Sequence, residues 1–180
     1  MRFLALVLAA LSAFMIDAGP AAAADSPAAT PAHIGRHTST PEDQREIAQV
    51  VADFQASIKK KDSRLLSSLM LNPDIPFVSP APPEGIRKMR ELLHPGADGL
   101  RAGAFYEFAR MVRDSKEPLE ERFYNVKITQ DRNVAWVMFD YEFVEDGKVG
   151  NYGIETWQMM KNGEGRWKIA SVWWTYNPAP

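Results

Sequence analysis

The chain contains no cysteine, which excludes disulfide bonds and thiolate metal sites from its 180 residues. Such a domain must be held together by burial of its core alone. Histidine is also scarce, with three residues, and two of them, His33 and His37, lie in a segment rich in proline. Because Gly35 stands between them in that segment, we do not expect a helical His-x3-His metal pair. The sequence predicts no metal site and no cofactor.

The sequence also lacks a strong excess of either positive or negative charge. The net charge is -2, from 21 basic and 23 acidic residues, and the only basic run is 59–61. Nucleic-acid binding needs a concentrated basic face, so nucleic acid is not an expected partner. The sequence also has no glycine-rich phosphate loop, no Gly-x-Ser-x-Gly elbow and no His-Glu-x-x-His helix. These well-known catalytic motifs are therefore excluded, and no motif in the sequence identifies an activity.

Residues 1–24 are predicted to form a signal peptide. Arg2 supplies a positive end, an apolar run reaches Met15, and Ala21 to Ala24 offer small residues for cleavage. A membrane-spanning helix, the alternative, needs about 20 apolar residues, and Asp17 interrupts the run too early. We expect a periplasmic or secreted protein that has no contact with the membrane after leader removal.

Residues 25–39 are predicted to be a disordered linker, because alanine, proline, serine and threonine dominate them. The remaining 40–177 suit one domain, since a single core of this size is common. The domain should begin with a helix, because Thr40 can cap it and Pro41 suits its first turn. One face of that helix is apolar, with Ile47, Val50, Val51, Phe54 and Ile58 at helical spacing.

A second helix over 63–71 and a short edge strand over 76–80 should follow, the strand lying at an edge because proline flanks it. The middle of the chain is ambiguous, with amphipathic helices expected over 85–94 and 102–113. The last third favours long antiparallel strands, because β-branched and aromatic runs alternate with Asp/Asn/Gly turns. These strands are 119–129, 134–144, 149–161 and 167–176. The order predicts an α+β domain, with helices packed on one face of a curved antiparallel sheet.

Several of these segments resemble the nuclear transport factor 2-like superfamily, in its SnoaL-like and ketosteroid-isomerase-like bacterial branch. The resemblance covers about 40–176. It rests on the start of the second helix (Asp62-x-x-Leu65-Leu66), on Asp131-Arg132-Asn133-Val134-Ala135-Trp136-Val137, and on Gly165-Arg166-Trp167-Lys168-Ile169. It implies a cystatin-like cone, in which a curved sheet wraps a long helix around an apolar pocket. Some members of the superfamily are isomerases, cyclases or dehydratases, and many only bind ligands or partners.

Glu155 is the candidate catalytic residue within such a cone. A carboxylate among Trp157, Tyr141 and Trp173 would lose hydration, its pKa would rise, and it could act as a general base near neutral pH. Tyr141 is the predicted hydrogen-bond donor to a developing enolate, a role suggested by the likeness to ketosteroid isomerases, with Tyr152 and Tyr176 as alternatives. The competing interpretation pairs Glu155 with Lys168 or Arg166 on a neighbouring strand. The predicted pocket lining is Phe54, Phe139, Trp157, Trp173 and Tyr176.

Two classes of function therefore remain. The first is an exported module that binds a small apolar molecule or a partner, and it is favoured because no polar constellation is compelling. The second is a cofactor-independent isomerase, cyclase or dehydratase that uses Glu155 as its base. In either class we expect a homodimer, because the strand face that carries Trp136 and Met138 is too apolar to be left in water.

Overall fold

The computed structural model describes residues 30–92 and 94–179, without the side chains of 101 and 102, and divides the chain after Gly35. The predicted signal peptide lies outside the described residues. Within them, no helix is long and apolar enough to cross a membrane. The second unit begins at Arg36, before the predicted boundary at residue 40. The Thr38 amide donates to Asp131 Oδ1 at 2.9 Å, which ties the end of the predicted linker to the domain.

The two predicted N-terminal helices are confirmed. α1 spans Pro41–Lys60, and the Thr40 hydroxyl oxygen accepts a hydrogen bond from the Asp43 amide at 3.1 Å. The helix ends at Lys61, which adopts a left-handed conformation with φ 53°. α2 spans Ser63–Ser68 and is capped by Asp62, whose carboxylate accepts from the Leu65 amide at 2.9 Å.

A seven-stranded sheet forms the other layer of the domain. Its strands are β1 (Pro76–Pro80), β2 (Leu100–Ala104), β3 (Leu119–Asp131), β4 (Val134–Glu145), β5 (Lys148–Lys161), β6 (Trp167–Trp174) and β7 (Asn177–Pro178). Their order is β2-β1-β6-β5-β4-β3, and β7 pairs with β5. All pairs are antiparallel except β1 with β6, so the sheet is mixed. The tight turn between β4 and β5 has positive φ at Asp146 and Gly147, as a two-residue hairpin requires.

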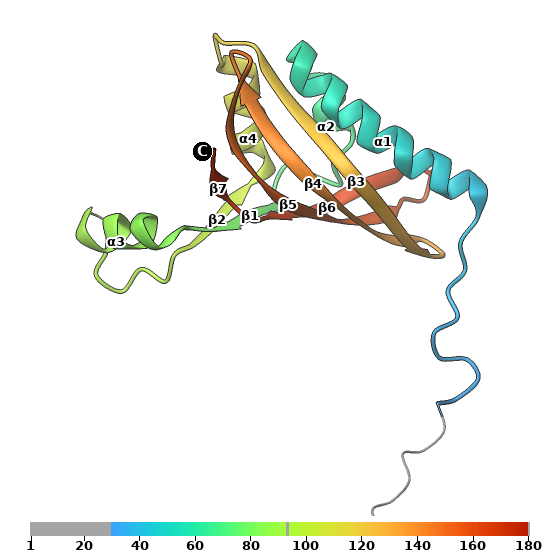
Figure 1. Ribbon diagram of the computed structural model, residues 1–180. Coiled ribbons are helices and arrows are strands. Elements are labelled where there is room, and N and C mark those ends of the chain that lie inside the picture. The colour runs from blue at the N-terminus through green and yellow to red at the C-terminus, as the bar shows by residue number, and fades with distance from the viewer. Residues whose placement is uncertain (1–29, 93, 180) are drawn as a thin grey trace, which may run out of the picture. The chain divides into compact units, whose positions relative to one another are not determined.

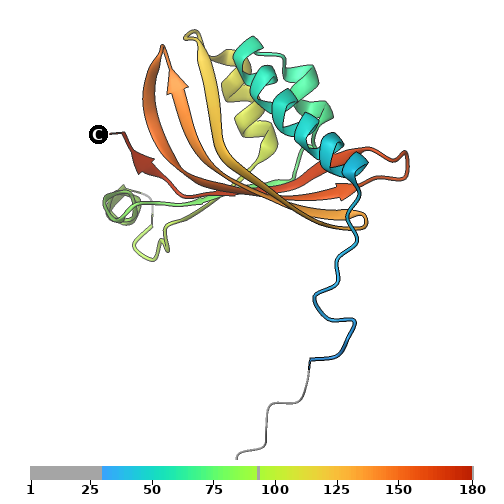
Figure 2. The ribbon, with the colours of Figure 1, turned by 45° about the vertical axis from the view of Figure 1, so that its right-hand side comes forward.

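The sheet is strongly curved, and α1, α2 and α4 (Phe105–Asp114) lie on its concave side (Figures 1 and 2). Register shifts interrupt the β3–β4, β4–β5 and β5–β6 ladders, and such bulges bend a sheet. The core lies between the helices and this inner face, around Phe54, Phe139 and Trp157. The predicted α+β class with helices on one face of a curved sheet is therefore confirmed, and the sheet departs from the predicted antiparallel form in the parallel pairing of β1 with β6.

The middle of the chain that the sequence left ambiguous contributes α3 (Pro83–Leu92) and β2, which form an arm together with the predicted strand β1, as Figure 1 shows. Two predictions for this part of the chain were wrong. The helix expected from residue 102 begins only at Phe105, because 100–104 form β2. β1 is not an edge strand, because β2 covers one side of it and β6 the other. The prolines at both ends of β1 leave its central residues free to pair.

A buried carboxylate, Asp43, joins α1 to three strands of the sheet. Its Oδ1 accepts from Lys161 Nζ of β5 at 2.6 Å and from Trp167 Nε1 of β6 at 3.0 Å. Its Oδ2 accepts from the Thr40 hydroxyl and from Gln130 Nε2 of β3, both at 2.8 Å. These contacts hold the pKa of Asp43 far below its ordinary value, the hydrogen bond from Lys161 being the largest cause. Asp43 therefore fixes the start of α1 on the sheet.

Candidate functional site

Glu155 lies on the inner face of β5, in the core of the domain. It is 4% exposed and stands opposite Phe139 of β4 on one side and Trp174 of β6 on the other. Its Oε1 accepts a hydrogen bond from Trp157 Nε1 at 2.6 Å. Burial raises the pKa of Glu155 to about 8, and the indole hydrogen bond opposes this shift. The sequence-based expectation of a desolvated carboxyl at this position agrees with this environment.

The alternative, a cross-strand ion pair, is wrong. Lys168 Nζ donates to the main-chain oxygen of Ser68, and the Arg166 guanidinium contacts Glu164 in its own turn. Within the described residues, no cation forms an ion pair with Glu155. The alternative fails because Lys168 stands opposite Met160, five residues beyond Glu155 along β5.

A second buried carboxyl, Glu121 on β3, was missed by the sequence analysis. It is 5% exposed, and its Oε2 has no hydrogen-bond partner among the described residues. Burial raises the pKa of Glu121 well above its ordinary value, and the charge of Glu155 raises it further. Strand parity could have identified it, because Leu119, Glu121 and Phe123 alternate along one face. Two acids thus share the interior, and burial favours their neutral forms.

Tyr141 of β4 lies between the two acids. It stands opposite Phe123 of β3 and Gly153 of β5, so that Glu121 and Glu155 are its diagonal neighbours. Its hydroxyl is 2.9 Å from both Asn151 Oδ1 and the main-chain oxygen of Thr175. Burial, and then the charges of the two glutamates, raise the pKa of Tyr141. The predicted donor is therefore near the predicted base, and its proton is already used within the protein.

The main chain at Thr175 covers this part of the interior. A Cβ atom at Gly153 would meet the Thr175 oxygen at 2.3 Å, so only glycine fits opposite Tyr141. β7 then continues along β5 beyond the end of β6. The close approach places a main-chain acceptor where the Tyr141 hydroxyl can reach it.

Aromatic rings pack against one another on the inner side of the sheet, beside Glu155. Three predicted lining residues, Phe54, Phe139 and Trp157, are buried there, and the Phe54 and Trp157 rings lie 4.8 Å apart between centroids. The prediction for Trp173 was wrong, because it is 54% exposed and stands opposite Thr156 on the outer face. Trp174 points inward instead and contacts Phe77. Tyr176 is also exposed, beyond the end of β6.

Four of the inner rings are only partly buried. These are Phe108 of α4, Phe123 of β3, Phe143 of β4 and Trp174 of β6. Phe143 stands directly opposite Glu121, so this unpartnered carboxyl lies beside a ring that retains exposed surface. These four rings are the aromatic side chains of the inner cluster that retain exposed surface.

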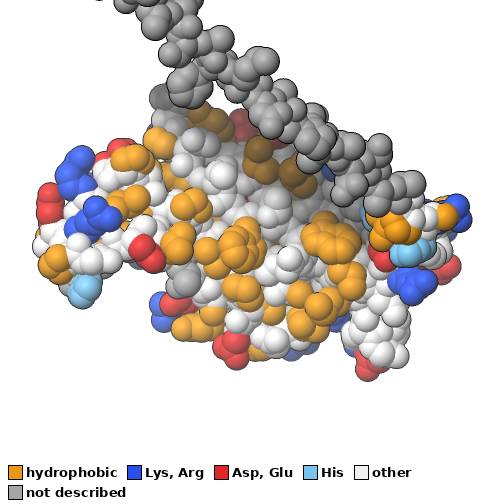
Figure 3. Space-filling model, turned by 90° about the horizontal axis from the view of Figure 1, so that it is seen from below, with side chains coloured by type: hydrophobic (Ala, Val, Ile, Leu, Met, Phe, Trp, Pro, Cys, Tyr) orange, Lys and Arg blue, Asp and Glu red, His pale blue; other side chains and the backbone are white. Residues whose placement is uncertain are grey.

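The outer face of the sheet is apolar and exposed. Six of its large side chains are each more than 40% exposed: Trp136, Met138, Tyr152, Ile154, Met160 and Trp173. They come from three neighbouring strands, β4, β5 and β6, and Figure 3 shows hydrophobic side chains gathered on this face. Such a contiguous surface is unusual for a monomer in water.

The sequence model of the SnoaL-like domain family matches residues 47–172, and the chain belongs to this family. Solved structures with the same fold include an NTF2-like protein of unknown function from Shewanella baltica, at 14% identity and a TM-score of 0.55 over 79% of this chain and 100% of that one. A candidate dehydratase of the NTF2-like family from Streptomyces avermitilis gives 16% identity and a TM-score of 0.55, over 78% and 100%. A candidate scytalone dehydratase from Novosphingobium aromaticivorans gives 13% and 0.54, over 76% and 85%. Curated proteins yield no match.

Proposed function

We propose that the domain binds a small, largely apolar, uncharged molecule on the inner side of its sheet. The observation that carries this proposal is the unpartnered, buried Oε2 of Glu121 beside Glu155. A buried polar atom without a partner lowers stability by about 1–3 kcal/mol, so its presence suggests a ligand. The half-buried rings of Phe108, Phe123, Phe143 and Trp174 would contact the apolar body of that ligand.

The protonation state of Glu121 and Glu155 determines which polar group of a ligand they can bind. A neutral carboxyl can donate and accept a hydrogen bond, so the pair suits a hydroxyl or a carbonyl. A carboxylate ligand would face two acids, with which no cation of the described residues forms an ion pair on this inner side, and it should be rejected. We infer a neutral ligand, such as a phenol or a ketone.

Binding of 2-naphthol, a neutral aromatic alcohol, tests this proposal. Glu121→Leu removes the hydrogen-bonding group without leaving a charge, and we expect the dissociation constant at pH 6 to rise about tenfold, as for one lost hydrogen bond of about 1.4 kcal/mol. Glu120→Gln is the matched control, because Glu120 points to the other face of β3, towards Lys59 and Arg122. Calorimetry giving equal affinities for the two variants would refute the proposal.

A second candidate function is a cofactor-independent isomerase, cyclase or dehydratase with Glu155 as general base. It is supported by the raised pKa of Glu155 and by the two neighbours described as candidate dehydratases. A base of pKa near 8 beside a bound carbonyl compound could remove a proton from the adjacent carbon. Glu155→Gln should then preserve binding and lower turnover by about 10²- to 10⁴-fold.

We propose a homodimer formed by the outer sheet face. The exposed side chains of Trp136, Met138 and Ile154 supply the apolar surface that a self-complementary interface needs. Trp136→Glu should convert the dimer to a monomer, because each interface would bury two new charges. Light scattering at high micromolar concentration measures this, with Tyr106→Glu on α4 as an exposed aromatic control. A monomeric parent protein would refute the proposal.

We also propose export, from the leader-like sequence of residues 1–24. Cleavage after Ala24 should give a mature chain that starts at or near Asp25. Intact-mass analysis of the protein expressed in its native host would measure this. A product that retains Met1 would contradict the proposal.

A further inference from the structure

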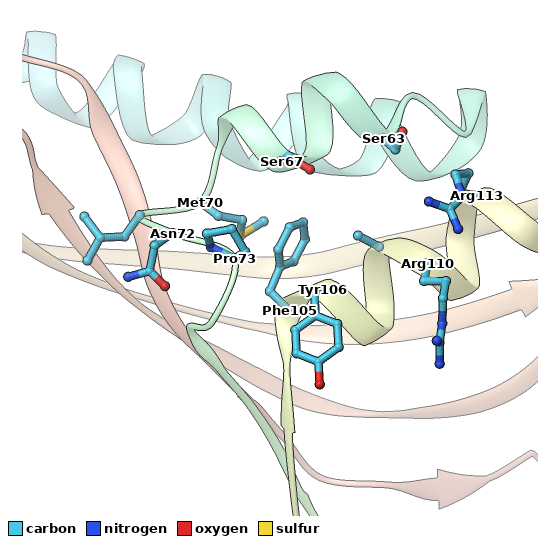
Figure 4. A pocket seen from close by; sticks show the side chains of 11 residues that line it. Ser63, Ser67, Met70, Asn72, Pro73, Phe105, Tyr106, Arg110 and Arg113 are labelled. Atoms are coloured by element: carbon cyan, nitrogen blue, oxygen red, sulfur yellow. The ribbon is translucent and has the colours of Figure 1, made fainter.

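A hollow of about 450 Å³ lies between α2 and α4, remote from the two buried acids (Figure 4). Its apolar surface comes from Met70, Phe105 and Ala109, of which Met70 and Phe105 are almost completely buried in the core. The ring of Tyr106, which is half exposed, extends this surface outward. The volume is within the range of small-molecule sites, about 300–1,000 Å³.

The polar side chains that line the hollow come mainly from α2 and α4. Tyr106, Arg110 and Arg113 recur at spacings of four and three along α4, so they share one face of that helix. Ser63 and Ser67 are one turn apart on α2. Figure 4 shows that the Arg113 side chain lies near α2, whereas those of Tyr106 and Arg110 extend away from it at the rim. No carboxylate is among the residues that line the hollow.

The two arginines differ in their protein contacts. Arg113 is held by Asp114 through Nε at 2.7 Å and Nη2 at 3.0 Å, so its charge is already compensated. Arg110 is exposed at the rim of the hollow and forms no ion pair within the part of the chain that the structure describes, although its charge acts on Asp114 one turn further along α4. The hollow therefore has at its rim one guanidinium without an ion-pair partner among the described residues, and serine hydroxyls on α2.

We propose that this hollow binds a small organic carboxylate. Its carboxylate would take a bidentate hydrogen bond from Arg110, and its apolar body would cover Phe105, Met70 and the Tyr106 ring. A singly charged head suits the single guanidinium at the rim that forms no ion pair among the described residues. The site is separate from the inner side of the sheet and takes a ligand of opposite character, an anion rather than a neutral molecule.

The test compares 2-naphthoate with its neutral analogue 2-naphthamide. We expect naphthoate to bind at least tenfold more tightly than naphthamide, and its dissociation constant to rise at least tenfold in Arg110→Gln. Arg110→Lys should give an intermediate value, because lysine keeps the charge and loses the bidentate geometry. Arg87→Gln, on the exposed face of α3, is the matched control.

Methionine-methyl NMR locates the bound ligand. Met70 lines the hollow, so naphthoate should shift its methyl signal. Met159 is buried on the inner face of β5, and its methyl signal should remain unchanged. Equal affinity of the Arg110→Gln and Arg87→Gln proteins, equal binding of naphthamide, or a shift at Met159 alone would each overturn the proposal. Because Arg110 is exposed, the variant should retain the parent's melting temperature, which circular dichroism checks.

Discussion

Replacing Asp43 by alanine should destabilise the domain by about 3–5 kcal/mol, the cost of removing one partner from a buried ionic network. Four side-chain donors converge on this carboxylate, two on each oxygen, and they come from the helix cap and from three strands. After the substitution, the Trp167 indole would be left without its acceptor, and Lys161 would keep only its 3.3 Å contact with Glu46. Urea unfolding at pH 7 measures the loss.

Glu42→Ala is the control, because Glu42 precedes Asp43 in the first turn of α1 and is exposed. It should cost less than about 1 kcal/mol, the usual contribution of a charge near a helix terminus. Equal losses in the two variants would mean that Asp43 acts only through the helix dipole, and would contradict the network.

The pH dependence of the same contribution follows from the depressed pKa of Asp43. The unfolded carboxyl titrates near 3.9, so the contribution is fully present above that pH and is lost as pH falls towards the folded pKa. Wild-type and Asp43→Ala proteins should therefore differ most above about pH 5 and should converge in acid.

Local sequence patterns were sufficient to predict most of the helices and strands and the fold class. The Thr40 cap, the Asp146-Gly147 turn and the alternation in β4 each depend on a few neighbouring residues, and each is present in the structure. The position of β1 depends instead on pairing with β2 and β6, which lie 20 or more residues away in sequence. Proline at both ends suggested an edge, and only the tertiary pairing shows that the strand is interior.

The candidate site was partly predictable for the same reason. Glu155 could be predicted because the residues of β5 were assigned to two faces, and Glu155 shares its face with Gly153 and Trp157. In β6 the adjacent residues Trp173 and Trp174 have opposite orientations, and composition alone could not say which is inward. Glu121 was missed because β3 was not assigned its faces, although its flanking Leu119 and Phe123 carried the signal.

The buried acids Glu121 and Glu155 should make the domain less stable as pH rises from about 5 to about 8. For each acid the unfolded carboxyl ionises near 4.3, whereas the folded one keeps its proton to higher pH. The unfolded state therefore binds fewer protons in this window, and stability falls by about 1.4 kcal/mol per pH unit for each acid that remains protonated. This slope is opposite in sign to that of Asp43, which acts only in acid.

Urea unfolding between pH 5 and 8 tests this expectation against a Glu121→Gln, Glu155→Gln double variant, in which the slope should be lost because glutamine does not titrate. Glu120→Gln, on the outer face of β3, should retain the wild-type slope. A carboxyl NMR titration adds the assignment: Glu155 should titrate near pH 8, as burial beside Phe139 and Trp174 requires. Parallel stability profiles for the wild type and the double variant, together with a pKa near 4.3 for Glu155, would remove the physical basis of both proposals. The neutral-ligand site needs interior acids that keep their protons at neutral pH, and the general base needs a carboxylate whose basicity is raised by burial.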